Sequence, residues 1–271
     1  MSRTAEPPGR EGSPTDRSAE LTRRRTARVT AVVLVLVVAF GAAFVVNRSG
    51  AKHGGGHGHG SHHKGSHAAA ACGAQPPPPH APGHWQHPPA LKLQPGTDYR
   101  AVIHTSCGDI KIDLLEKTAP QTVANFVFLA KHGFYDGRRW FRVENNSVIQ
   151  TGDPNDRNGV PPDGPGYAIP DELPNKARVY VYGVVAMANA GQPDSGGSQF
   201  FIVIHHNEPA GYDPRYSIFG KVDPSSDGVL DKIGAQKTFG GSDPIKSVTP
   251  ITPVFINSVE ILTGTGSSGG A

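Results

Sequence analysis

The stretch Ser198-Gln199-Phe200-Phe201-Ile202 is the most informative part of this 271-residue chain for its fold. Side chains of a strand alternate between its two faces, so Phe200 and Phe201 cannot both enter one core. One of the two rings is therefore free to form the floor of a pocket. Shortly before this stretch, Met187-Ala188-Asn189-Ala190-Gly191 has small residues whose backbone another segment can approach closely.

Two upstream segments place polar side chains within strand-like apolar sequence. Trp140-Phe141-Arg142-Val143 contains an arginine, and Val148-Ile149-Gln150-Thr151 contains a glutamine. An unpaired charge in such surroundings is energetically costly, so we treat Arg142 and Gln150 as candidate site residues.

From about Tyr99 to Leu262, the chain resembles the cyclophilin family of peptidyl-prolyl cis-trans isomerases. The resemblance is carried by five motifs in the family's order, which makes chance similarity an inadequate explanation. It implies a mainly β fold, a closed eight-stranded antiparallel barrel capped by two helices. The motifs are Ala119–Phe126, Gly133–Gly137, the Arg142 and Gln150 segment, Met187–Phe201 and Tyr216–Val222.

Local patterns agree with such a fold. Thr118 and Gln121 fit a capping box and Pro120 suits a first helical turn, which predicts a helix of about fourteen residues that ends at Gly133. Its apolar positions, at helical spacing, are Val123, Phe126, Val127 and Ala130. Short segments rich in β-branched or aromatic residues predict strands at Tyr99–Thr105, Asp109–Leu114, Val179–Ala186, Gln199–Ile204 and Val254–Ile261.

The chain divides by composition into five parts. We predict a cytoplasmic basic tail (1–28), a transmembrane helix (29–46), a disordered Gly/His/Pro-rich linker (47–96), the isomerase domain (97–265) and a flexible tail (266–271). Within Val29–Val46, Thr30 has the only strongly hydrogen-bonding side chain, and the preceding arginines place the amino terminus in the cytoplasm. The domain then lies outside the plasma membrane, anchored by a single span.

A cleaved signal peptide is the alternative for Val29–Val46. The apolar run is longer than is usual for such a peptide, and Asn47-Arg48-Ser49-Gly50 is a poor cleavage site. Both alternatives export the domain.

The net charge separates along the chain. Residues 1–52 contain nine Lys or Arg and four Asp or Glu, which leaves 17 basic and 19 acidic residues in the rest. The exported part is therefore slightly acidic, and we expect no nucleic acid partner.

Nine of the thirteen histidines lie in the linker, from His53 to His87. Closely spaced imidazoles on a flexible chain, such as His57, His59, His62 and His63, can bind Zn, Cu or Ni, although without fixed partners the binding is weak and unselective. The alternative is a hydrophilic spacer without bound metal.

The two cysteines, Cys72 and Cys107, leave two alternatives open. An exported protein can pair them in a disulfide that fixes the end of the linker to the barrel. Otherwise both remain free thiols, with Cys107 packed in a strand.

Rotation about an Xaa-Pro bond breaks no covalent bond, so we expect no cofactor and no metal. The barrier of about 20 kcal/mol comes from lost amide resonance. A hydrogen-bond donor at the nitrogen of the twisted amide favours the transition state over the planar ground state. The resemblance gives this role to Arg142, which Gln150 orients.

The resemblance also implies a set of substrate-binding residues. Phe201 corresponds to the pocket floor, Gln199 to a polar neighbour, and Ala188, Asn189 and Ala190 to the segment that pairs with the peptide backbone. The remaining positions depart from the family pattern: Ser147 replaces a phenylalanine, Val148 a methionine, Tyr212 a leucine and Tyr216 a histidine. We therefore expect isomerase activity with a less apolar pocket and weak binding of cyclosporin-like macrocycles.

The sequence thus predicts a monomeric, membrane-tethered peptidyl-prolyl isomerase that accelerates folding of proline-containing exported polypeptides. Two alternatives are a catalytically weak module that binds proline loops, and a metal-binding envelope protein that uses the His-rich linker.

Overall fold

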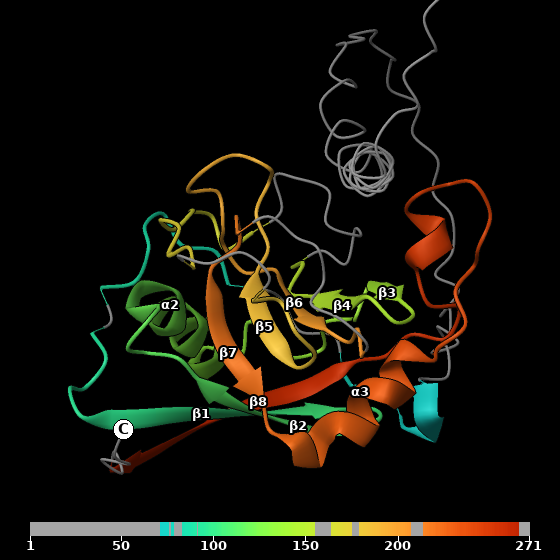
Figure 1. Cartoon of the computed structure of the whole chain (residues 1–271), viewed down its shortest axis with the longest axis horizontal. Helices are drawn as coiled ribbons and strands as arrows, with labels where there is room; N and C mark the ends of the chain where they lie inside the picture. Colours follow the sequence, from blue (N-terminus) through green and yellow to red (C-terminus); the bar gives the residue numbers. More distant parts are fainter. Residues whose placement is uncertain are drawn as a thin grey trace, which may run out of the picture. The chain divides into compact units, whose positions relative to one another are not determined.

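One antiparallel sheet of eight strands forms the framework of the described residues (Figure 1). The computed structural model describes residues 71–75, 77–78, 83–90, 92–154, 164–174, 179–206 and 214–265. The strands are β1 (Thr97–Thr105), β2 (Gly108–Leu114), β3 (Arg142–Glu144), β4 (Val148–Thr151), β5 (Val184–Met187), β6 (Phe200–Val203), β7 (Ile218–Val222) and β8 (Ile256–Thr265). The helices are α2 (Pro120–Lys131) and α3 (Asp227–Gly234), and the 3-10 turns are Ala71–Gly73, Pro224–Ser226 and Lys246–Val248.

The sheet curls until its two ends meet. Its strand order is β3-β4-β6-β5-β7-β2-β1-β8, so β3 and β8 are the edges. Just before these two strands, a bridge pairs Arg139 with Phe255, and the backbone N–H of Trp140 donates to the Val254 carbonyl at 2.9 Å. The predicted mainly β, eight-stranded antiparallel fold with two helices is confirmed, but the closure is this short bridge rather than a continuous strand pair.

The main core lies between the concave face of the sheet and α2. Phe200 and Ile202 of β6 point into this core and are fully buried. The ring of Phe126 on α2 lies 5.6 Å from that of Phe200 and 5.2 Å from that of Phe219. The four apolar helix positions predicted from the spacing are all buried, so they form the face with which α2 packs on the sheet.

The amino terminus of α2 is capped from a distance, so the predicted capping box is wrong. Thr118 donates to the Leu115 carbonyl instead of capping the helix. The Glu172 carboxylate accepts hydrogen bonds from the backbone N–H groups of Gln121 and Thr122, at 3.0 and 2.8 Å. A carboxylate from another segment thus satisfies the free N–H groups and matches the positive end of the helix dipole.

One predicted strand is shorter than expected. The segment Val179–Ala186 forms β5 only from Val184, because Tyr182 and Gly183 make a turn in which Gly183 has a φ of 78°. The Val184 N–H donates back to the Val181 carbonyl at 3.0 Å. The other predicted strands are found with ends shifted by up to four residues.

Part of the stretch predicted to be a disordered linker is ordered against the domain. The Trp85 ring lies 5.1 Å from that of Phe128 on α2 and 5.8 Å from that of His132, which follows the helix. The backbone N–H of Trp85 donates to the Pro165 carbonyl at 2.8 Å. The composition of this stretch, rich in Gly, His and Pro, did not indicate that Trp85 packs against an apolar side chain of α2.

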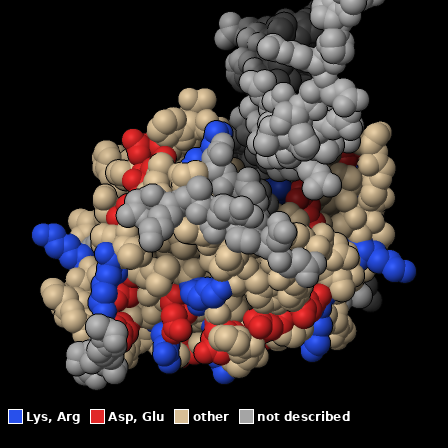
Figure 2. Space-filling view, viewed as in Figure 1, with Lys and Arg blue, Asp and Glu red and all other residues tan. Residues whose placement is uncertain are grey.

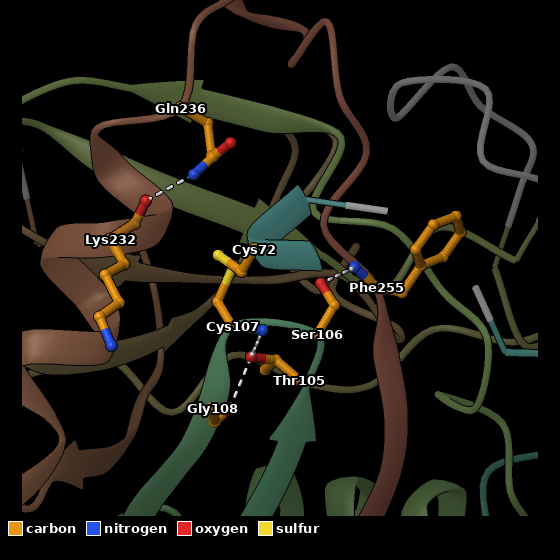
Figure 3. The surroundings of a disulfide bond; sticks show 8 residues. All are labelled: Cys72, Thr105, Ser106, Cys107, Gly108, Lys232, Gln236 and Phe255. Carbon is orange, nitrogen blue, oxygen red and sulfur yellow. Dashed lines mark hydrogen bonds between the residues drawn. A yellow bond between two sulfur atoms is a disulfide. The ribbon is translucent and has the colours of Figure 1, made fainter. Parts of the chain in front are cut away.

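A disulfide between Cys72 and Cys107 joins the same stretch to the tip of the β1–β2 hairpin (Figure 3). Of the two alternatives for the cysteines, the structure shows the pair, with a Cα–Cα distance of 5.2 Å. The hairpin tip is itself fixed, because the Cys107 N–H donates to the Thr105 hydroxyl at 3.1 Å and the Phe255 N–H to the Ser106 hydroxyl at 3.2 Å. Next to Cys72, the Ala71 N–H donates to the Pro253 carbonyl at 2.8 Å.

The described residues exclude both predicted tails (1–28 and 266–271), the predicted membrane span Val29–Val46 and most of the predicted linker. Among the helices that the structure does describe, none combines the length and the apolar character needed to cross a bilayer. On the face of the domain drawn in Figure 2, acidic and basic side chains alternate along the lower rim.

We expect the disulfide to stabilise the fold. It closes a loop of 35 residues in the unfolded chain, for which chain entropy alone predicts a loss of at most about 4 kcal/mol when Cys72 and Cys107 are both changed to Ser. Urea unfolding measures this loss of stability. A Trp85→Phe background is used, so that Trp140 in the core is the only tryptophan and reports the transition. Wild type treated with a reductant is the control and should match the double variant, whereas an unchanged midpoint would contradict the expectation.

We also expect Glu172→Ala to destabilise the domain by about 1–2 kcal/mol, because the first turn of α2 loses its cap. Glu172→Gln, which keeps one acceptor oxygen, should lose less. Glu116→Ala is the matched control, since Glu116 makes no hydrogen bond or ion pair with the described residues. Equal midpoints for Glu172→Ala and this control in thermal unfolding would show that the cap contributes nothing.

Candidate functional site

Three of the candidate site residues lie in one row across neighbouring strands. Arg142 of β3 is directly opposite Gln150 of β4, and Gln150 is directly opposite Phe201 of β6. Directly opposite residues of antiparallel strands project to the same face of a sheet. The arginine, the glutamine and the aromatic ring therefore share the outer face.

The adjacent row points the other way. Val143 pairs with Ile149 and Ile149 with Ile202, and all three belong to the main core. The two phenylalanines of β6 separate in the same manner, with Phe200 in the main core and Phe201 in a smaller apolar cluster on the outer face. This outer cluster contains Val148, Tyr180, Val184, Ala186, Phe201 and Val203.

The Arg142 guanidinium is held on two sides. Its Nε and Nη2 donate to Glu144 Oε1 at 2.9 and 2.7 Å, and its Nη1 donates to Gln150 Oε1 at 2.9 Å. About a quarter of each charged side chain is exposed, 26% for Arg142 and 25% for Glu144. The charge on this apolar strand is thus paired, and it still reaches solvent.

Gln150 links the arginine to the strand with the aromatic ring. Its Nε2 donates to Gln199 Oε1 at 3.1 Å, while its Oε1 accepts from Arg142. A chain of side-chain hydrogen bonds therefore runs from Glu144 through Arg142 and Gln150 to Gln199. Each member limits the rotation of the next one, so the network orients the guanidinium before any substrate arrives.

Two tyrosines form the aromatic part of the outer face. The Tyr216 ring meets the Phe201 ring edge-to-face, with centroids 5.2 Å apart. The Tyr180 hydroxyl donates to the Tyr216 carbonyl at 2.9 Å and accepts from the Tyr216 N–H at 3.1 Å. Burial raises the pKa of Tyr180 to about 12, further above neutral pH than the ordinary value, and the protonated hydroxyl donates this bond. Tyr216 is thereby held over Phe201, which retains 5% exposure.

The segment Ala188–Ala190 continues from β5 with part of its backbone free. The Ala188 N–H donates to the Gln199 carbonyl at 2.9 Å, which keeps the segment beside β6. The Asn189 side chain is used internally, because its Nδ2 donates to the Arg215 carbonyl at 2.8 Å and its Oδ1 accepts from the Gly191 N–H at 3.1 Å. The backbone N–H and carbonyl of Asn189 bond to no group among the described residues, so they are available to an extended peptide.

One close packing contact and two hydrogen bonds hold the loop that leads into Gln199. A Cβ at Gly152 would lie 2.3 Å from the Ser198 carbonyl oxygen, so only glycine fits there. The Ser198 hydroxyl donates to the Gly152 carbonyl at 2.8 Å, and buried Asn125 of α2 donates to the Gly197 carbonyl at 2.6 Å. The strands β4 and β6 therefore keep a fixed spacing at the end where Gln150 and Gln199 lie.

The structure brings the described members of the predicted set to one face. Tyr212 lies outside the described residues, as do His57, His59, His62 and His63. Within the described part of the chain, no group of three or more His, Cys, Asp or Glu side chains is arranged to hold a metal ion. The face contains Arg142, Val148, Gln150, Gln199, Phe201 and Tyr216, with Ser147 in the turn that bonds to Glu144 and with Ala188, Asn189 and Ala190 beside β6.

Sequence reasoning missed two residues of this site. Glu144 follows Arg142 by two positions on a strand, and the period of two places both on the same face, so its contact with Arg142 could have been found. Tyr180 gave no comparable signal, because its bonds to Tyr216 join segments 36 residues apart.

Chemically, the outer face offers an oriented cationic donor, an apolar aromatic surface and a free backbone edge. None of the described residues of this face is an activated nucleophile. The arrangement suits a reaction in which an amide is held and its nitrogen receives a hydrogen bond.

Comparisons with known proteins agree with this geometry. Residues 100–260 match the family model described as cyclophilin type peptidyl-prolyl cis-trans isomerase/CLD. The chain is 38% identical over 177 residues to the peptidyl-prolyl cis-trans isomerase A of Mycobacterium tuberculosis H37Rv, which covers 59% of this chain and 91% of that protein. It is 42% identical over 135 residues to a Helicobacter pylori peptidyl-prolyl cis-trans isomerase, covering 49% of this chain and 78% of that protein.

Among solved structures, the fold matches a Cryptosporidium parvum cyclophilin type peptidyl-prolyl cis-trans isomerase. The TM-score is 0.51 at 28% identity, and the match covers 61% of this chain and 98% of the other. A second structure of that protein, obtained in the presence of the dipeptide Ala-Pro, matches with a TM-score of 0.51 at 27% identity. The enzyme class expected from the sequence is confirmed, and the chain belongs to the cyclophilin-type peptidyl-prolyl cis-trans isomerase family.

Proposed function

We propose that this isomerase uses Arg142 as the hydrogen-bond donor to the nitrogen of a twisting prolyl amide. As the amide rotates, its nitrogen loses conjugation and becomes a better acceptor. A guanidinium that is already oriented by Glu144 and Gln150 gains a stronger bond in the transition state than in the planar ground state. That difference is what accelerates rotation.

The observation that carries this proposal is the row formed by Arg142, Gln150 and Phe201 on the outer face. A proline ring in contact with Phe201 and Tyr216 would place the amide that precedes it toward Gln150 and Arg142. The free N–H and carbonyl of Asn189 would hold the substrate backbone on the opposite side. Proline capture, backbone docking and the donor thus come from neighbouring parts of one surface.

We further propose that the substrates are proline-containing polypeptides outside the plasma membrane. The Cys72–Cys107 disulfide supports this setting, because such bonds persist mainly in oxidising compartments. The apolar run Val29–Val46 and the arginines before it support a single-pass anchor with a cytoplasmic amino terminus. The domain would then act near the membrane on chains that have just been exported.

One observation favours a second candidate function, a proline-loop binding module with little turnover. Phe201 is only 5% exposed, so a proline ring has little of its surface to contact. Exchange spectroscopy on a proline peptide separates the two functions. An isomerase speeds the cis-trans interconversion of the peptide, whereas a binding module shifts its signals and leaves that rate unchanged.

For Arg142→Ala we expect kcat/KM for a proline peptide to fall by about 100-fold, the usual loss on removal of one transition-state donor. Arg142→Lys should recover only part of it, because an ammonium cannot bond to Glu144, Gln150 and substrate in the same planar geometry. The measurement is the rate of cis-trans exchange with full-length protein. Full activity in the alanine variant would exclude Arg142 as the donor.

The adjacent phenylalanines provide a matched pair. We expect Phe201→Leu to weaken substrate binding with a loss of stability under about 1.5 kcal/mol, because it changes the outer cluster. Phe200→Leu should instead lower the free energy of unfolding by more, because it disrupts the edge-to-face contacts with Phe126, Tyr135, Trp140 and Phe219, while KM stays near wild type. Urea unfolding and peptide titration measure both, and the reverse pattern would contradict the assignment of faces.

A further inference from the structure

We propose that Glu144 is a positioning residue for the reaction, which fixes the Arg142 guanidinium so that its free edge is presented to the substrate amide. This inference rests on the proposed function of Arg142. Glu144 is not among the site residues that were expected from the sequence.

The hydrogen bonds of the guanidinium define which part of it is left for the substrate. An arginine has five N–H donors in a rigid plane. Three are used within the described residues: Nε and Nη2 each give one to Glu144 Oε1, and Nη1 gives one to Gln150 Oε1. One N–H on Nη1 and one on Nη2 remain, so Glu144 and Gln150 occupy the flanks of the group and leave its end free.

Glu144 is itself held in place by the turn that follows it. The Ser147 N–H donates to the Glu144 carbonyl at 3.0 Å, and the Ser147 hydroxyl donates to Glu144 Oε2 at 3.2 Å. One carboxylate oxygen thus binds the arginine and the other binds the turn. A long arginine side chain alone would sample many rotamers at a partly exposed site, so this anchor restricts the donor to one orientation.

The same ion pair also lowers the positive charge that the substrate experiences. Removal of Glu144 would therefore have two opposite effects: a looser guanidinium and a stronger local positive charge. We assign the larger effect to orientation, because the transition state needs a donor at one point beside the amide nitrogen, and misplacement by about 1 Å can reduce rates by about 100-fold. The observed sign of the change in activity distinguishes the two effects.

The test uses two variants of the full-length protein and a matched control. Glu144→Ala removes the partner of Arg142, whereas Glu144→Gln keeps an acceptor oxygen and removes the charge. The control is Asp113→Ala, since Asp113 also pairs with an arginine, Arg100 at 2.7 Å, but on strands β1 and β2 away from the site. Cis-trans exchange of a proline peptide gives kcat and KM, and NMR of the Arg142 Nε–H signal reports its exchange with water.

We expect Glu144→Ala to lower kcat about tenfold with a KM within about twofold of wild type, and to speed exchange of the Arg142 Nε–H. Glu144→Gln should recover most of kcat, and Asp113→Ala should equal wild type in all three measurements. A kcat in Glu144→Ala at or above the wild-type value would overturn the proposal. If the alanine variant does not fold, Glu144→Gln decides: a modest fall in kcat with faster Nε–H exchange supports the proposal, and wild-type values for both overturn it.

The Arg142→Ala variant keeps this test separate from the proposed function. If Arg142→Ala is inactive and Glu144→Ala is unaffected, only the role of Glu144 fails. If Arg142→Ala retains full activity, the proposed function fails before Glu144 is considered.

Discussion

Strand β6 must be buried on both faces, and the rest of the structure follows from this constraint. Its four residues, Phe200 to Val203, are all buried, although they alternate between opposite sides of the sheet. The inner side is covered by α2, whose Phe126 ring packs against Phe200. The outer side has no helix over it among the described residues, and the Tyr216 ring packs edge-to-face on Phe201 there. The aromatic contact on this side is therefore made by a side chain rather than by a helix.

The position of Arg142 follows from the same geometry. A charge placed opposite Gln150 and in the same row as Phe201 stands at the rim of the outer apolar cluster, where an unpaired guanidinium would be costly. Its three hydrogen bonds to Glu144 and Gln150 remove most of that cost and leave the group partly exposed, at 26%. The pairing that makes the charge tolerable is therefore also the pairing that orients it. If Arg142 is the donor proposed above, stability of the fold and readiness for catalysis depend on the same contacts.

Much of the fold was predictable because its signals are local. The alternation of faces separated Phe200 from Phe201, and the helical spacing of Val123, Phe126, Val127 and Ala130 identified the buried side of α2. Apart from Glu144 and the turn that shortens β5, the features that sequence reasoning missed or assigned wrongly depend on contacts between distant segments. Glu172 caps α2 from about 50 residues away, Trp85 packs on α2 from a stretch whose composition indicated disorder, and the pair Tyr180 and Tyr216 is joined across 36 residues. No periodicity encodes such contacts, since they depend on how the whole chain closes.

The stretch before the domain shows what its composition did not predict, since its described residues pack on the domain. A segment rich in Gly, His and Pro cannot bury enough apolar surface to order itself. The disulfide from Cys72 to Cys107 removes much of that requirement, because it limits the space that the stretch can explore in any state of the chain. Once the stretch is confined, little apolar surface is needed, and Trp85 packs against Phe128 of α2 and His132 just after it. The disulfide, the Trp85 ring and backbone hydrogen bonds from Ala71 and Trp85 thus act together to hold the described part of this stretch on the domain, and Trp85 covers part of the second side of α2.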